Sequence, residues 1–323
     1  MKSQQMIIFG ALLLLLFLTP ATGQTCTPQT SAVSIVSAAD YSNNLAPGSL
    51  VTMFASNIAT AIYTASDASP AQLPTSLGGV SATMTDASGK SFPIGLTAVT
   101  PTQANGVLPE GLNVTPNPNV LPIVNLTTSN GSHLCGIAYG LNTVAPSLFT
   151  ADDSGQWLPA AQVIITHQNG AQTVIPSVAQ YTATLTYNVT TWSHYIPVPV
   201  NLGGPTDTAV LILFGTGMRH VTEFNASLCS TSSTNPTGPC QLVGVDPLEF
   251  SNGSFSILYA GAQGLGEPGS FYGLDQVNVL MPYSLAGSGI VTFSISMPSY
   301  CSIGCALSPW QAVESKPVSI LIQ

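Results

Sequence analysis

The residues of this chain that could do chemistry are few, and their spacing does not form a catalytic set. A serine hydrolase needs a serine activated by a nearby histidine and acid, and the sequence contains no G-x-S-x-G motif. His133 and His167 stand beside Asn-Gly turns, and His220 follows a glycine-rich segment, so turn or loop positions are expected for all three. We therefore predict no catalytic residue from this set.

Paired carboxylates for glycoside hydrolysis are not indicated either, although the thirteen acidic residues do not exclude them by number. Turn-like sequences hold the aspartates at positions 86, 152, 153 and 207, where this side chain is expected to bond the local backbone. Asp275 corresponds to Thr102 in an internal repeat described below. The sequence predicts a protein that is not an enzyme, with a secreted hydrolase as the least favoured alternative.

Metal and cofactor sites are also not expected. No EF-hand-like loop is present, and Asp152-Asp153 is interpreted as a solvated linker rather than a calcium site between domains. Cys301 and Cys305 have no histidine or second cysteine pair at a spacing suited to zinc. The glycine-rich residues 261–273 lack the Gly-Lys-Ser/Thr ending of a phosphate-binding loop.

An aromatic group at residues 190–195 is the strongest candidate for ligand binding. The sequence TTWSHY places Trp192, His194 and Tyr195 among polar side chains. Exposed aromatic rings offer an apolar face and a polar tip, which suits the stacking of neutral sugars. The alternative is that Trp192 fills the core at the end of a strand, and the same alternative applies to Trp157 and Trp310.

The six cysteines suggest disulfides in an oxidising compartment. Cys229 and Cys240 flank a loop rich in Ser, Thr, Asn and Pro, and Cys301 and Cys305 flank Ser-Ile-Gly, so each pair is expected to close a short loop. Cys26 and Cys135 would then pair by elimination. This third bond would tie the N-terminal segment to the first domain.

The composition excludes several classes of protein. Charged residues make up 5% of the 323 residues, against roughly 25% in an average soluble protein. Four Lys and Arg residues cannot build the basic patch that a nucleic-acid binder needs. The 45% of apolar residues is enough for a large core, so general disorder is not expected. The remaining class is a β-rich extracellular protein with an uncharged polar surface.

Short apolar segments separated by turn signals predict an all-β fold. Many of them alternate apolar residues with Thr, Ser or Asn, which is typical of strands with one buried face. Asn-Gly pairs between them favour tight hairpin turns. The expected strands include residues 49–54, 80–85, 121–127, 163–166, 209–214, 254–259, 277–281, 290–297 and 318–322. Many short strands at this spacing predict β-sandwiches or β-barrels.

An internal repeat indicates two copies of one β unit. Residues 50–58, LVTMFASNI, match residues 210–218, VLILFGTGM, in pattern. A Q-x-N-x-x-x-P motif also occurs twice, as Gln103, Asn105 and Pro109 and as Gln276, Asn278 and Pro282. The Gln and Asn of each copy share a strand face, and we expect their amides to bond the backbone of a neighbouring loop.

These repeated segments carry a resemblance to a known family. Residues 35–59 resemble the opening of the acidobacterial Solibacter-type C-terminal domain family, and further landmarks follow in order at residues 101–105, 145–150, 213–217, 258–261 and 276–282. The resemblance implies immunoglobulin-like β-sandwiches of the IPT/TIG type in an exported module without an assigned activity. The insertion between Cys229 and Cys240, and Ala55 in place of a glycine, depart from the family pattern.

The first 23 residues have the pattern of a secretory signal peptide, with Lys2, an apolar run at residues 7–18 and small residues after Pro20. As a helix, this run would rise about 18 Å, short of the roughly 30 Å needed to span a membrane. We expect cleavage before Gln24, a sandwich at residues 24–150, and a second at 151–323.

The predicted protein is therefore exported, either secreted or held at the cell surface. Its expected function is structural or adhesive, through contact with an extracellular protein or glycan and not with nucleic acid. The alternative is a protein that binds neutral carbohydrate through its exposed aromatic residues.

Overall fold

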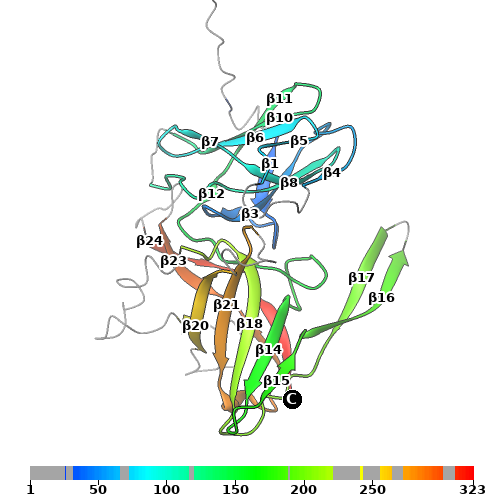
Figure 1. Ribbon diagram of the computed structural model, residues 1–323, viewed down its shortest axis with the longest axis vertical. Helices are drawn as coiled ribbons and strands as arrows, with labels where there is room; N and C mark the ends of the chain where they lie inside the picture. Colours follow the sequence, from blue (N-terminus) through cyan, green and yellow to red (C-terminus); the bar gives the residue numbers. More distant parts are fainter. Residues whose placement is uncertain are drawn as a thin grey trace, which may run out of the picture.

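The computed structural model describes residue 26 and residues 32–65, 73–115, 120–187, 190–220, 241–242, 255–263, 272–300 and 310–323. These residues form an all-β structure, as the sequence predicted. Among them, the one helical segment is a single 3₁₀ turn, η1 (Tyr283–Leu285). The strands gather in two bodies that lie one above the other in Figure 1.

The first body is a sandwich of two antiparallel sheets. One sheet has the order β1 (Ser34–Ser37), β3 (Leu50–Phe54), β9 (Gln103–Val107), β8 (Gly95–Val99), β4 (Tyr63–Thr64). The other has the order β11 (His133–Ile137), β10 (Ile123–Thr127), β6 (Val80–Thr85), β5 (Ser76–Leu77), with β7 (Ser91–Pro93) also paired to β6. A short parallel pair joins β2 (Asn44–Leu45) and β12 (Gly140–Leu141). Alternate residues of β6 are buried, because period-two sequences place every second side chain between the sheets.

The second body is built around a larger sheet with the order β15 (Gln172–Ile175), β14 (Ala161–Thr166), β18 (Thr208–Thr216), β21 (Asp275–Met281), β20 (Phe255–Ala262), β19 (Gln241–Leu242). The short strand β13 (Ser147–Leu148) also pairs with β18. Two further antiparallel pairs join β22 (Gly289–Phe293) to β25 (Val318–Ile322), and β23 (Ser296–Tyr300) to β24 (Trp310–Glu314). Val291, Phe293 and Ile320 from these pairs share one core with Leu211 and Val279 of the large sheet.

Two separate hydrophobic cores mark the division of the chain. The first contains buried residues from Val33 to Leu141, and the second contains buried residues from Val144 to Ile322. Ala145 already donates a backbone hydrogen bond to Gly217 in the second body. The change from one core to the other therefore falls at residues 142–143, a few residues before the predicted boundary at 150.

The internal repeat has the same strand register in both bodies. Phe54 of β3 lies opposite Gln103 of β9, and Phe214 of β18 lies opposite Gln276 of β21. A β-bulge also recurs at the same place. The extra residue is Thr97 on β8 and Leu258 on β20, and in each case the residue after it faces the Asn of the repeated motif. Bulges are specific features of a strand pair, so this agreement supports two copies of one unit.

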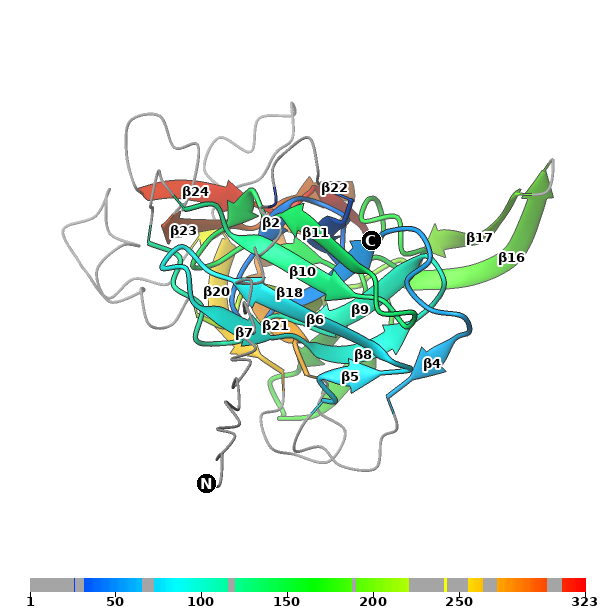
Figure 2. The same ribbon diagram turned by 90° about the horizontal axis from the view of Figure 1, so that it is seen from above.

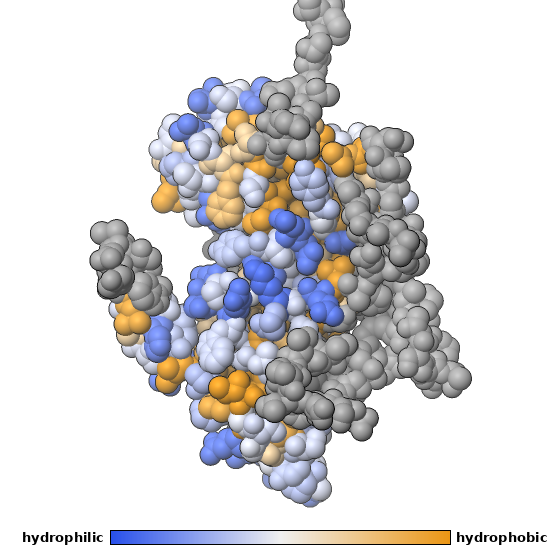
Figure 3. Space-filling view, turned by 180° about the vertical axis from the view of Figure 1, so that it is seen from behind, coloured by the Kyte–Doolittle hydropathy of each residue, from blue (hydrophilic) through white to orange (hydrophobic). Residues whose placement is uncertain are grey.

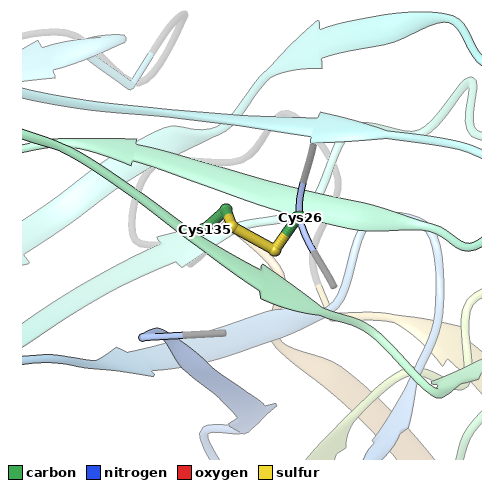
Figure 4. The surroundings of a disulfide bond; sticks show 2 residues. All are labelled: Cys26 and Cys135. Carbon is green, nitrogen blue, oxygen red and sulfur yellow. A yellow bond between two sulfur atoms is a disulfide. The ribbon is translucent and has the colours of Figure 1, made fainter. Parts of the chain in front are cut away.

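A disulfide joins Cys26 to Cys135 of β11, with 5.9 Å between their Cα atoms (Figure 4). This is the pair that the sequence suggested by elimination. Cys229, Cys240, Cys301 and Cys305 lie outside the described residues.

Candidate functional site

A long hairpin stands apart from both sandwiches. It consists of β16 (Ala179–Tyr187) and β17 (Thr190–Pro197), and we call residues 179–197 the arm. The two strands form a two-stranded sheet of their own, to which no other described strand is hydrogen-bonded. Figures 1 and 2 show the arm extending outward beside the second sandwich. Both outer edges of the arm are therefore open among the described strands.

The surface of the arm is apolar and uncharged. Tyr181, Leu185 and Ile196 are exposed large apolar residues, and the sequence of the arm contains no Asp, Glu, Lys or Arg. Figure 3 shows hydrophobic side chains along the arm, at the left of that view, alternating with polar ones. An isolated hairpin gains little from packing, so these side chains are not placed there to build a core.

All three residues predicted to bind a ligand lie on β17 of the arm. Trp192 is directly opposite Leu185 in the register, but its side chain lies outside the described part of the structure. His194 Nδ1 lies 2.6 Å from the hydroxyl of Thr182, the bulge residue of β16. The Tyr195 ring meets the Tyr181 ring edge to face, with centroids 5.6 Å apart. His194 and Tyr195 thus bond within the hairpin and stiffen it.

A charged cluster that sequence reasoning missed joins the two sandwiches. Arg219, the single arginine of the chain, donates to Glu110 of the first sandwich at 2.7 Å and to Asp275 of β21 at 3.0 Å. His220 Nε2 lies 2.7 Å from the second oxygen of Glu110. Asp275 is fully buried and also accepts the backbone N–H of Met218 at 2.6 Å. We call Glu110, Arg219, His220 and Asp275 the clamp.

The contacts of the clamp shift the pKa values of Glu110, Arg219 and Asp275. Burial alone would raise the pKa of Glu110, but hydrogen bonds and charge from His220 and Arg219 reverse this and lower it. Burial raises the pKa of Asp275, and the Arg219 charge offsets part of the rise. Burial by itself would lower the pKa of Arg219, but the charge of Asp275 raises it. His220 and Arg219 thus favour the ionised form of Glu110, and we interpret the clamp as a contact that joins the two sandwiches.

A comparison of the two copies shows where the sequence signal for the clamp lay. In the first copy, the N–H of Ile58 bonds the carbonyl of Pro101 at 2.9 Å. In the second copy, the equivalent N–H of Met218 bonds the Asp275 carboxylate instead. The sequence held two signs of the clamp. Asp275 differs from its counterpart Thr102, and the lone arginine, Arg219, follows the matched turn.

The amides of the repeated Q-x-N motif bond to each other within each copy. Gln103 donates to Asn105 and Gln276 donates to Asn278, each at 2.7 Å, so the described bond joins the two amides of one motif. All four amide residues are half-buried. Outside the motifs, His167 bonds Asp207 and Thr173, both at 2.9 Å, near its predicted turn. Pro282 immediately precedes the η1 turn.

Metal sites and membrane-spanning helices are absent from the described residues. No group of three or more His, Cys, Asp or Glu residues among them could hold a metal ion. None of the helices in that part of the chain is long and apolar enough to cross a membrane. Comparison with protein-family models, with curated proteins and with solved structures gave no match to this chain.

Proposed function

We propose that this chain is an exported interaction or adhesion module, not an enzyme, whose arm contacts an extracellular partner protein. The observation that carries the proposal is the arm itself, an uncharged two-stranded sheet with exposed Tyr181, Leu185 and Ile196, whose edges pair with no other described strand. Immunoglobulin-like sandwiches of the IPT/TIG type are the scaffold we propose for it.

The strand edges explain why the arm favours a protein partner. An open edge presents unpaired backbone N–H and C=O groups that can add another strand. Proteins that avoid such pairing place charged residues or prolines on the edge. Between residues 179 and 196 the arm has neither. A partner in extended conformation would therefore gain main-chain hydrogen bonds and apolar contacts at the same surface.

Two features support export. The apolar N-terminal segment matches a signal peptide, and the Cys26–Cys135 disulfide is of the kind that persists in oxidising compartments. Carbohydrate binding by the arm is less favoured, because the edge of one tyrosine ring packs against the face of the other.

A binding assay on intact cells tests the proposal. Fluorescently labelled residues 24–323 are added to washed cells that produce the protein, with and without prior protease treatment of the cells. Leu185→Lys with Ile196→Lys places two charges on the arm, and Ile290→Lys on β22 is a control with a similarly exposed residue. We expect saturable, protease-sensitive binding that the arm variant loses by tenfold or more and the control retains. Equal binding by the arm variant contradicts the proposal.

A further inference from the structure

Two exposed aromatic residues have strained backbone conformations at the junction of the two sandwiches. Tyr41 has φ 57° and Trp157 has φ 76°, and they are 45% and 46% exposed. The other non-glycine residues with positive φ among those described are Asn57 and Asp153, residue types that adopt this region readily. A bulky aromatic residue does so only where the surrounding structure requires it.

Contacts between the two bodies hold both residues in place. Gly155, two residues before Trp157, lies so close to Asp40 that a Cβ atom there would come within 2.5 Å of the Asp40 Cα. Lys316 donates from Nζ to the carbonyl of Asp40, next to Tyr41. Within the second body, the Trp157 carbonyl accepts the N–H of Ser319 at 2.7 Å. We call this junction the seam; it fixes the backbone of Tyr41 and Trp157, and both residues stay nearly half exposed.

The aromatic rings and carboxylates of the seam favour a neutral ligand over an anionic one. The Tyr41 ring lies 6.3 Å from that of Phe54, and the exposed Asp152 and Asp153 precede Trp157. Each described Lys and Arg is already engaged, since Lys316 bonds Asp40, Arg219 pairs with Glu110 and Asp275, and Lys90 lies over the Phe92 ring. An anionic ligand would meet carboxylates and no available cation. A neutral sugar would find ring faces to stack on and carboxylates to accept its hydroxyl groups.

We propose that Tyr41 and Trp157 form a binding site for a neutral oligosaccharide at the seam between the sandwiches. The site is separate from the arm and does not rest on the function proposed for it. Exposed rings on a rigid backbone lose little conformational entropy when a ligand binds, which gives a physical reason for holding them in a strained conformation.

Glycine substitutions test the site without disturbing the fold. Glycine adopts positive φ freely, so Trp157→Gly and Tyr41→Gly remove the rings and relieve strain at the same position. Tyr283→Ala removes an aromatic ring of matched exposure, 44%, on η1. The assay is affinity electrophoresis of residues 24–323 in gels containing hydroxyethyl cellulose, xylan, galactomannan or glycol chitin, with thermal unfolding of each variant.

We expect at least one polysaccharide to retard the wild type, a tenfold or greater loss of affinity in each glycine variant, and no change for Tyr283→Ala. Thermal midpoints at or above that of the wild type would show that the loss is not due to unfolding. The proposal is overturned if no polysaccharide retards the wild type or if the glycine variants bind normally. The arm variant Leu185→Lys with Ile196→Lys should bind sugar normally, which separates this test from that of the arm.

Discussion

Asp275 is a buried carboxyl group whose hydrogen-bond partner Arg219 also links the two sandwiches. A carboxylate with no exposure is costly unless it is paired and hydrogen-bonded. Here the backbone of Met218 and the guanidinium of Arg219 meet it, and Arg219 reaches on to Glu110 of the other sandwich. The Arg219–Asp275 pair, which compensates a buried carboxyl group in the second sandwich, thus also connects that sandwich to the first.

The first prediction concerns the loss of this pairing. Arg219→Leu should lower the free energy of unfolding by about 3 kcal/mol, because it leaves Asp275 buried without its partner. Lys90→Leu removes a cation from an exposed turn and should cost about 1 kcal/mol or less. Urea unfolding followed by circular dichroism measures both. A loss for Arg219→Leu no larger than that of the Lys90 control would show that the clamp contributes little.

The second prediction concerns acid stability and rests on Asp86. Burial would raise the pKa of Asp86, but hydrogen bonds from Ser88, Asn113 and Lys90 outweigh it and lower the pKa. A lowered folded pKa means that the ionised form stabilises the fold above about pH 4 and that this contribution is lost as the pH falls through the folded value. The difference in unfolding free energy between wild type and Asp86→Asn should therefore shrink from pH 7 to pH 3. A constant difference would contradict this assignment.

At the scale of elements, the repeated sequence motifs produce the same strand pairing in both sandwiches. The Phe–Gln pairing and the bulge one residue past the motif Asn recur in both sandwiches. Turn geometry recurs as well, since Asn57 and Gly217, each three residues after the Phe, have positive φ. One difference between the two copies lies at the clamp, where the N–H of Met218 bonds Asp275 and that of Ile58 bonds Pro101.

The third prediction follows from the matched amides. Gln103→Leu and Gln276→Leu each remove one half-buried hydrogen bond, to Asn105 and Asn278. Each should cost about 1 kcal/mol, or a few °C in the unfolding midpoint of the sandwich concerned. Scanning calorimetry of both variants gives the comparison. If either midpoint stays at the wild-type value within error, the amide pair is not a stabilising feature of the repeat.

The whole molecule consists of two cores whose junction includes polar contacts and the packing of Gly273 against Leu50 and Val107. The clamp and the seam both lie at the junction, together with the hydrogen bond from the N–H of Leu50 to the Thr216 hydroxyl at 2.7 Å. Near the N-terminus, the disulfide closes a loop with a sequence separation of 109. Such a loop restricts the unfolded chain strongly.

The fourth prediction is that Cys26→Ser with Cys135→Ser lowers the stability of the first sandwich by about 2–5 kcal/mol and leaves the second unchanged. Limited proteolysis with mass spectrometry can follow each sandwich separately. Equal protease resistance of the first sandwich in wild type and variant would argue against a stabilising disulfide.

The sequence by itself determined the class of fold, the duplication and the Cys26–Cys135 pair. These properties are local or countable: alternation at period two, turn residues at fixed offsets, a repeated motif and an even number of cysteines. The sequence also singled out the TTWSHY segment, although it did not show that this segment belongs to a projecting hairpin.

The clamp, the seam and the change of core at residues 142–143 became visible only in the tertiary structure. Glu110 and Arg219 are 109 positions apart in the chain and meet because two separate sandwiches pack together. Likewise, a tryptophan in the sequence does not reveal its backbone angle, so the conformation of Trp157 follows from the packing of Gly155 on Asp40 and the bonding of Ser319. Contacts between distant segments depend on how the two sandwiches pack against each other. The periodicity of the sequence carries no information about that packing.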